Sequence, residues 1–276
     1  MKLRKVTAAS AVVLALAVSV TACGGDKKDD ASGGKKIKIG IKFDQPGLGL
    51  QEPDGSYSGF DVDVATYVAK KLGYQPNQIE WVQTKSADRE NALQRGDVKF
   101  IAATYSITDE RKQKVDFAGP YLLAHQDLLV KKGSDITKGT DLNSKKLCSV
   151  TGSTSAQNVQ KTIAPKANLR PLSGYSECVA GLQSGAVDAL TTDDSILAGF
   201  AAQDKYKGQF QLAGLKLSNE NYGIGVKKGD SATVDKINRA LEQMVSDKSW
   251  DKAVEKNFGP AHYKNEPAPK IGDIVK

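Results

Sequence analysis

The chain has 276 residues, of which 39% are hydrophobic and 26% charged, a composition that excludes disordered, fibrous and integral-membrane proteins. At roughly 150 residues per domain, this length predicts about two domains. The net charge of +7 falls to +4 without Lys2, Arg4 and Lys5, the only charges of the first 22 residues, and the remaining cations alternate with acids, which argues against a nucleic-acid partner.

The first element of the chain is an export signal. Basic residues 1–5 precede a small, apolar stretch over residues 6–20, which a Val-Thr-Ala-Cys sequence closes. This three-part layout predicts a signal peptide over residues 1–22. Cys23 resembles the acylated cysteine of bacterial lipoproteins, which implies lipidation and a location at the outer face of the plasma membrane. An ordinary signal followed by a chance cysteine is the alternative.

The segment after the signal contains no side chain that could form a core. Residues 24–34 are Gly, Asp, Lys, Ala and Ser, so burial cannot offset the entropy of ordering them. We therefore expect residues 23–35 to be a lipid anchor and a flexible spacer.

Two cysteines, Cys148 and Cys178, remain beyond the anchor. An even pair in an oxidising compartment usually forms a disulfide, and we expect one here; two buried free thiols are the alternative. Closing a loop of about 30 residues would stabilise the fold by roughly 3–4 kcal/mol in the chain-entropy model. The histidines and cysteines have no metal-ligand spacing, so we predict no metal and no other cofactor.

From residue 36 onward, short apolar runs alternate with helical periodicity. The first repeat predicts strand, helix, strand, helix and strand over residues 36–41, 62–72, 79–82, 88–94 and 98–103. The same order returns over residues 146–150, 155–163, around 169, 176–183 and 187–191. Two α/β lobes are the simplest interpretation. A C-terminal helix is expected to pack through one apolar face, made of Val234, Ile237, Leu241, Met244 and Val245.

Polar residues follow the last strand of each repeat. They are residues 104–108 in the first, including Thr104 and Ser106, and residues 191–194 in the second, including Thr192. Ligands of open α/β sheets bind outside the carboxyl ends of the strands. We therefore expect a cleft between the lobes, lined from both sides.

Arg111 and Asp193 carry the chemistry expected of this cleft. Thr108 is a candidate N-cap, so Arg111 would project from the first turn of a helix with unpaired N–H groups, an arrangement that suits a carboxylate. Asp193, in the opposite lobe, suits an ammonium group. Together they match the two poles of a zwitterion. The alternatives are a surface ion pair of Arg111 with Asp109 or Asp116, and a helix N-cap role for Asp193.

Several ordered motifs resemble those of family 3 solute-binding proteins, the extracytoplasmic receptors of polar amino-acid ABC importers. They lie at residues 59–69, 108–111, 115–117, 120–121 and 151–155. The resemblance spans nearly the whole mature chain and implies a type II periplasmic-binding-protein fold, in which two α/β lobes enclose a ligand cleft. Hinge strands are implied near residues 121–126 and 217–221. Lobe 1 would comprise residues 36–122 with 222–276, and lobe 2 residues 123–221.

The resemblance also assigns roles to residues of the cleft. It implies that Arg111 binds the α-carboxylate of the ligand and that Asp193 binds its α-ammonium group. Further polar contacts are implied for Thr104, Ser106, Thr154 and Thr192.

The chain departs from the family pattern in its first loop. Lys42 stands where many members carry an acid, and Arg89 lies in the loop before the second helix. Cations there would favour a ligand with a second carboxylate, although each could instead be a solvated charge. This loop and residues 102–106 resemble glutamate-binding receptors of Gram-positive importers, which implies glutamate ahead of aspartate and glutamine.

These observations favour a monomeric, lipid-anchored receptor that closes over an acidic amino acid and delivers it to an ABC permease in the membrane. An enzyme on the same scaffold, such as a dehydratase, would need a cleft group with a tuned pKa. The sequence offers no Ser-His-Asp set and no phosphate-binding glycine loop, and His125 falls near a predicted hinge. A signalling sensor would need a kinase or transmembrane module. We therefore expect no catalysis.

Overall fold

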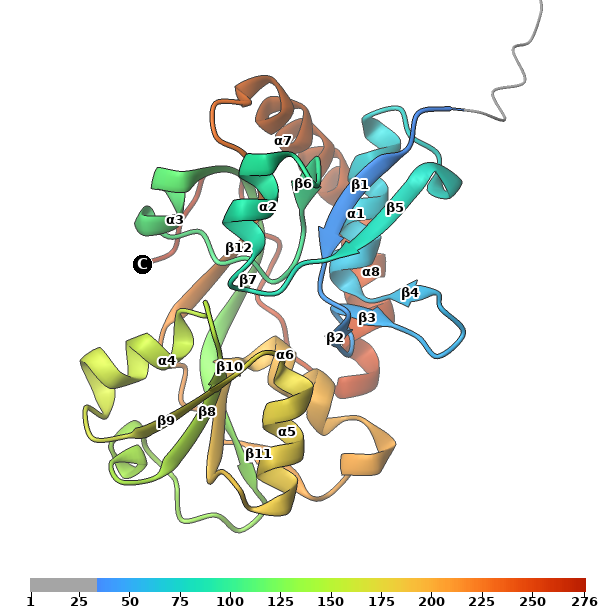
Figure 1. The fold of residues 1–276 in the computed structure, drawn as a ribbon. Helices are drawn as coiled ribbons and strands as arrows, with labels where there is room; N and C mark the ends of the chain where they lie inside the picture. Colours follow the sequence, from blue (N-terminus) through green and yellow to red (C-terminus); the bar gives the residue numbers. More distant parts are fainter. Residues whose placement is uncertain (1–33) are drawn as a thin grey trace, which may run out of the picture. The chain divides into compact units, whose positions relative to one another are not determined.

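A computed structural model describes residues 34–276 of the chain. The predicted signal peptide and the predicted acylation site, Cys23, lie outside the described residues. Residues 35–276 form one structural unit, built as two α/β lobes (Figure 1). No helix of this unit is both long and apolar enough to cross a lipid bilayer.

A nine-stranded sheet runs through both lobes in the order β5-β1-β6-β12-β7-β10-β8-β9, with β11 also paired to β7. In chain order these strands are β1 (Ile37–Ile41), β5 (Ile79–Gln83), β6 (Phe100–Ile101), β7 (Val115–Lys131), β8 (Lys146–Val150), β9 (Asn168–Leu172), β10 (Ala189–Asp193), β11 (Phe210–Leu212) and β12 (Asn219–Lys227). Strand β7 has 17 residues, of which the sequence predicted only the hinge segment near residues 121–126.

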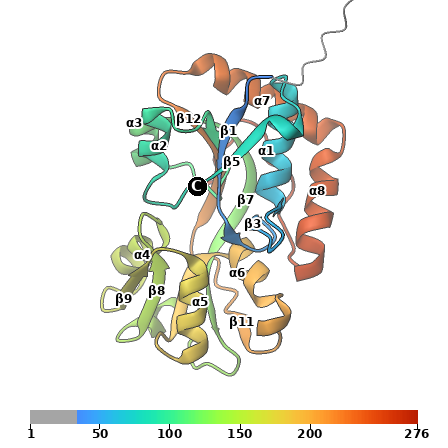
Figure 2. The same cartoon turned by 45° about the vertical axis from the view of Figure 1, so that its right-hand side comes forward.

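Strands β7 and β12 join the lobes (Figure 2). From Val115 to His125, β7 pairs antiparallel with β12. From Gln126 to Val130 it pairs with β10 of the second lobe instead. The change of partner falls inside the expected hinge, residues 121–126 and 217–221. The exact lobe boundaries remain a prediction.

Helices cover both faces of the first-lobe sheet (Figures 1 and 2). Phe100 and Ile101 are neighbours in β6 and point to opposite sides, so they belong to different apolar clusters. One cluster includes Val68 of α1 and Ile237 of α7, and the other includes Leu93 of α2. The helices of this lobe are α1 (Phe60–Lys71), α2 (Arg89–Arg95), α3 (Asp109–Lys114), α7 (Ser231–Ser246) and α8 (Ser249–Phe258). The predicted packing face of α7 is confirmed, because Ile237, Leu241 and Met244 are buried.

A small antiparallel sheet occupies the loop that follows β1. It consists of β2 (Asp44–Gln45), β3 (Gly49–Gln51) and β4 (Tyr57–Ser58). Short 3₁₀ segments complete the chain at Pro76–Gln78, Gly139–Leu142, Asp204–Tyr206 and Gly259–Ala261.

The second lobe contains α4 (Ser155–Asn158), which continues as a π-helix (Val159–Ile163), then α5 (Tyr175–Ser184) and α6 (Asp194–Ala201). The expected disulfide between Cys148 and Cys178 is present and links β8 to α5. Strand β10 begins at Ala189 rather than at residue 187, so Asp193 is its last residue.

Candidate ligand-binding site

The predicted site residues lie where the two lobes meet. Thr104 and Ser106 follow β6 of the first lobe, and Thr192 and Asp193 end β10 of the second. All four are buried. The carboxyl ends of these strands therefore face each other across the lobe contact, as the sequence predicted.

Arg111 is held by the local structure that the sequence indicated. Thr108 caps α3, its Oγ1 accepting the Arg111 backbone N–H at 3.2 Å. The buried guanidinium donates to the Ser106 carbonyl at 2.8 Å and, across the lobe contact, to the Gly152 carbonyl at 3.1 Å. Arg111 pairs with Glu90, whose Oε1 lies 3.8 Å from Arg111 Nε, and not with Asp109 or Asp116, which pair with Lys112 and Lys228.

Asp193 occupies the N-cap position of α6, but its side chain makes no capping hydrogen bond. Instead, its Oδ2 accepts the Tyr222 hydroxyl at 2.5 Å. Burial, and then the nearby Glu220 carboxylate, raise the pKa of Asp193 well above its ordinary value, while the hydrogen bond from Tyr222 lowers it. The alternative of a side-chain cap is therefore wrong, and one carboxylate oxygen has no described partner.

Lys42 and Arg89 are both buried, so the alternative of solvated charge is wrong for each. Lys42 Nζ donates to Ser86 Oγ at 2.8 Å. Burial, and then the Arg89 charge, hold the pKa of Lys42 well below its ordinary value. Arg89 is the first residue of α2 and not part of the loop before it, as the sequence had suggested. It donates to the Ala103 carbonyl at 2.9 Å, and burial lowers its pKa to about 10.

Both guanidinium groups, of Arg89 and of Arg111, lie close to one aromatic ring. The centroid of Tyr105 lies 3.9 Å from Arg89 Cζ and 5.0 Å from Arg111 Cζ. Cation–π contact of this kind offsets part of the cost of burying neighbouring cations.

Asp61 is a buried acid beside the predicted site that the sequence did not single out. Its carboxylate accepts the Thr104 backbone N–H at 2.9 Å and the Tyr121 hydroxyl at 2.6 Å. Thr104 needs this support because its φ of 46° is left-handed, a conformation that costs free energy in a residue with a Cβ. Burial raises the pKa of Asp61 to about 6. The sequence signal that could have identified Asp61 is an acid near the start of a helix face whose other residues are apolar.

Buried polar atoms without partners cluster in this region. Within residues 34–276 they are Gln45 Nε2, Arg89 Nε, Tyr105 Oη and Gln203 Oε1. The first three belong to the site, since Gln45 accepts the Thr104 hydroxyl and Arg89 lies over Tyr105. Two of these three atoms are obligate donors, which marks the region as suited to an acceptor-rich ligand.

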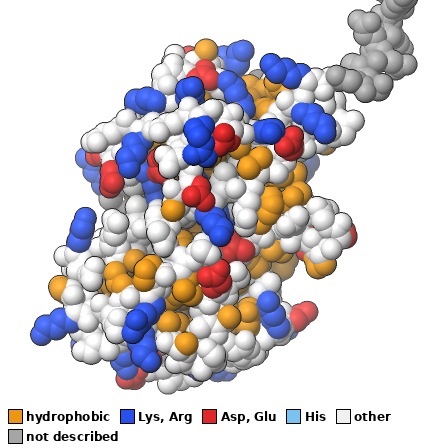
Figure 3. Space-filling view, in the orientation of Figure 1, with side chains coloured by type: hydrophobic (Ala, Val, Ile, Leu, Met, Phe, Trp, Pro, Cys, Tyr) orange, Lys and Arg blue, Asp and Glu red, His pale blue; other side chains and the backbone are white. Residues whose placement is uncertain are grey.

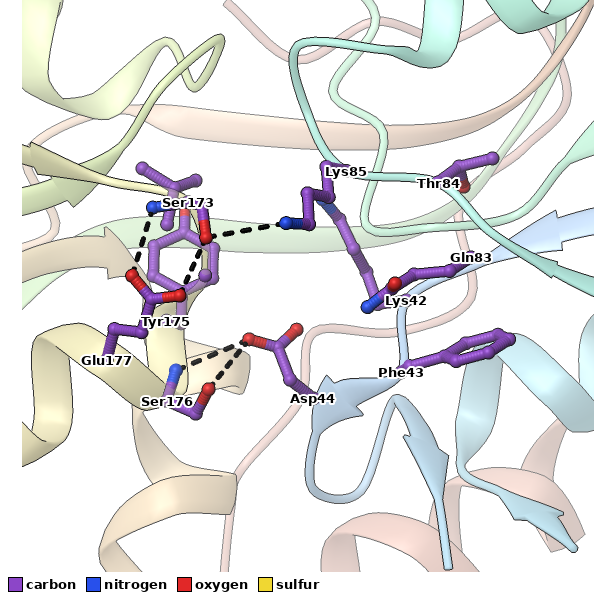
Figure 4. Close-up of a pocket in the computed structure, with 12 residues that line it drawn as sticks. Lys42, Phe43, Asp44, Gln83, Thr84, Lys85, Ser173, Tyr175, Ser176 and Glu177 are labelled. Atoms are coloured by element: carbon purple, nitrogen blue, oxygen red, sulfur yellow. Dashed lines mark hydrogen bonds between the residues drawn. The ribbon is translucent and has the colours of Figure 1, made fainter. Parts of the chain in front are cut away.

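The lobes are also joined around the site (Figure 4). Asp44 Oδ2 accepts the backbone N–H and the hydroxyl of Ser176, both at 3.3 Å, and Lys85 Nζ donates to Ser173 Oγ at 3.4 Å. A cavity of about 120 Å³ lies between these contacts and is lined in part by Lys42.

A second cavity, of about 250 Å³, is lined by Arg111 and Thr154. Neither cavity is lined by Arg89, Thr104 or Asp193, because these side chains are buried between the touching lobes. Within residues 34–276, no group of three or more His, Cys, Asp or Glu is placed to hold a metal ion.

In the view of Figure 3, Lys and Arg are interspersed with Asp and Glu. Two α/β lobes joined by two strands, with charges of both signs buried at their contact, define a two-lobed solute-binding protein of the type II periplasmic fold.

Residues 37–260 match the model of bacterial extracellular solute-binding proteins, family 3, and the chain belongs to this family. It is 45% identical over 271 residues to the glutamate-binding protein GluB of Corynebacterium efficiens, a match that covers 93% of this chain and 91% of the relative. It is 38% identical over 269 residues to the ABC transporter glutamine-binding protein GlnH of Bacillus subtilis, covering 92% and 97%.

Among solved structures, an ancestral arginine-binding protein bound to glutamine superimposes with a TM-score of 0.75. The two chains are 38% identical, and the match covers 81% of this chain and 98% of the other.

Proposed function

We propose that this protein is the lipid-anchored receptor of an ABC importer, which captures L-glutamate between its lobes as a monomer and delivers it to the permease. One observation carries this proposal: two buried cations, Lys42 and Arg89, lie in the same region as Arg111 and Asp193. Arg111 and Asp193 suit the two poles of an amino-acid zwitterion, and the cations suit a second carboxylate. The names of the glutamate- and glutamine-binding relatives support it.

In this proposal, each pole of the ligand meets a preoriented group. Arg111 binds the α-carboxylate, and the unpartnered oxygen of Asp193 accepts the α-ammonium group. Thr104, Ser106, Thr154 and Thr192 supply polar contacts from the two sides. Closure removes water from these charges and thereby strengthens each interaction.

Lys42 is the residue we assign to the side-chain carboxylate. Its ammonium group has three donors, of which the described residues engage one, through Ser86. The guanidinium group of Arg89, in contrast, is already held by the protein: it donates to the carbonyls of Ala103 and Thr104 and lies over Tyr105. Lys42 can therefore turn toward a ligand, whereas Arg89 contributes fixed positive charge.

A glutamine-binding receptor is the second candidate, favoured by the match to GlnH. Glutamine has the same chain length as glutamate but would leave Lys42 without a charged partner. The buried cations therefore rank glutamate above glutamine, with aspartate as the shorter dicarboxylate.

The test is a thermal-shift screen of the twenty amino acids, followed by calorimetric titration. A ligand at 100 times its dissociation constant stabilises by about 2.7 kcal/mol, so glutamate should give the largest shift. Labelled glutamate recovered chemically unchanged would separate a receptor from an enzyme on the same scaffold. A screen in which glutamate gives no shift would refute the proposed ligand.

Closure should fail when Gly199 acquires a side chain. A Cβ on Gly199, in α6, would overlap the carbonyl oxygen of Pro46 in the first lobe. We expect Gly199→Ala to lower glutamate affinity at least about tenfold, a loss of 1.4 kcal/mol, and to reduce the ligand-induced fall in the radius of gyration. Calorimetry and solution scattering measure the two effects.

Gly181→Ala is the matched control, because it is a helix position in the same lobe where the added Cβ lies 3.5 Å from Val187, an ordinary contact. Equal closure and affinity in both variants would show that the lobes do not approach as closely as in this structure.

The anchor is tested by Cys23→Ala. Without the thiol there is no site for the lipid, so the protein should move from the membrane fraction to the medium with unchanged glutamate affinity. Fractionation followed by titration measures both. Continued membrane association of the variant would exclude the lipoprotein assignment.

A further inference from the structure

Tyr222 is a fully buried residue of β12 that lies against Asp193. Its hydroxyl donates to Asp193 Oδ2 at 2.5 Å and lies 3.1 Å from Ser195 Oγ. A buried phenol held against a carboxylate in this way restricts the carboxylate to one orientation.

The backbone around Tyr222 is fixed to the opposite lobe from Asp193. Tyr222 bridges to Ser106, the Ile107 N–H donates to the Asn221 carbonyl at 2.8 Å, and the Gly223 N–H donates to the Tyr105 carbonyl at 3.0 Å. Ser106 is the same residue whose carbonyl accepts from Arg111. Arg111 is therefore connected to Asp193 through Ser106, which accepts its hydrogen bond, and through Tyr222, whose backbone lies beside that of Ser106 in a β-bridge.

We propose that Tyr222 is a positioning residue for amino-acid recognition: it holds one oxygen of Asp193, leaves the other for the ligand's ammonium group, and sets its distance from Arg111. This inference rests on the proposed function, because it assumes that Asp193 receives the ammonium group.

The charged and titratable groups around Asp193 explain why it needs this partner. After burial, the acids Glu220 and Asp194 raise the pKa of Asp193, whereas the Tyr222 hydrogen bond and the charge of Arg111 lower it. Asp193 in turn raises the pKa of the nearby phenols Tyr175 and Tyr263. Burial and Glu220 favour the protonated carboxyl, and a protonated Asp193 cannot pair with an ammonium group. The hydrogen bond from Tyr222 lowers the pKa of Asp193, so we expect loss of the Tyr222 hydroxyl to raise this pKa further.

The test is Tyr222→Phe in the full-length protein, with glutamate affinity measured by calorimetry across a range of pH. Hydrogen bonds to charged groups contribute enough that we expect a loss of at least about tenfold near neutral pH. The acid limb of the affinity profile should also move to higher pH, because Asp193 protonates earlier. A purely structural role would not move this limb.

Tyr67→Phe is the matched control, since the Tyr67 hydroxyl also donates to a carboxylate, Asp247, at 2.6 Å, but far from the cleft. The double variant Tyr222→Phe/Asp193→Asn should bind no worse than Asp193→Asn alone, because Tyr222 acts through Asp193.

The outcomes separate the two proposals. If Asp193→Asn weakens glutamate binding while Tyr222→Phe retains wild-type affinity at every pH, the inference about Tyr222 is wrong and the proposed function stands. If Asp193→Asn binds glutamate as the wild type does, the zwitterion assignment itself is wrong.

Discussion

Replacing Arg111 by alanine should reduce the affinity for every amino-acid ligand by at least about a hundredfold. The α-carboxylate is common to all of them, and its proposed partner is a buried guanidinium. Removing one partner of a buried charge pair costs roughly 3–5 kcal/mol, and each 1.4 kcal/mol is about tenfold in affinity. Titration with glutamate, glutamine and aspartate should therefore give parallel losses.

Two further variants distinguish charge recognition from damage to the fold. Arg95→Ala removes an exposed guanidinium that pairs with Asp97, and it should leave binding unchanged. Arg111→Lys retains the charge but loses the fork that reaches both Ser106 and Gly152, so it should bind with intermediate affinity. An Arg111→Ala protein that binds glutamate as tightly as the wild type would place the α-carboxylate elsewhere.

The repeated α/β pattern could be predicted from the sequence because its signals are local. The apolar stripe of α1 and the glycine that ends α2 in a left-handed conformation, Gly96, depend only on neighbouring residues. The disulfide was predictable for a different reason, since export leaves one possible pair of cysteines.

Other elements had no local signal. Strands β2, β3 and β4 contain two or three residues each, too few for an alternating pattern. Strand β7 includes Gly119 and Pro120, which normally interrupt a strand. Its length is set by partners far away in sequence, first β12 and then β10, so only the tertiary structure defines it.

The same distinction applies to the site. Arg111 and Asp193 could be proposed because each is a charged residue next to a recognisable strand or helix end. Tyr222 and Asp61 act by holding other residues, and their partners are 29 and 43 positions away. From sequence alone, Lys42 and Arg89 could either bind a second carboxylate of the ligand or be solvated charges. Their burial, which depends on whether the lobes cover them, excludes solvated charge.

Replacing Lys42 by methionine should weaken glutamate binding at least about thirtyfold and leave glutamine binding nearly unchanged. Truncating one partner of a buried, hydrogen-bonded charge pair costs about 2 kcal/mol or more, and only glutamate carries the second carboxylate. Lys85→Met is the matched control: Lys85 lines the same cavity but donates to Ser173 near the surface (Figure 4). It should not change the ratio of the two affinities.

The pH dependence provides an independent readout of the same contact. Burial and Arg89 lower the pKa of Lys42 in the ligand-free protein, and a bound carboxylate would raise it again. Glutamate binding should therefore take up a proton and weaken as the pH rises through the ligand-free pKa of Lys42, whereas glutamine binding should not.

Lys42→Met should abolish this difference between the two ligands. Arg89→Met should instead weaken both ligands and lower the melting temperature, because Arg89 holds the carbonyls of Ala103 and Thr104. If both variants keep the wild-type preference for glutamate over glutamine, neither cation recognises the side-chain carboxylate of the ligand. The glutamate assignment would then depend on resemblance to relatives and not on the chemistry of this site.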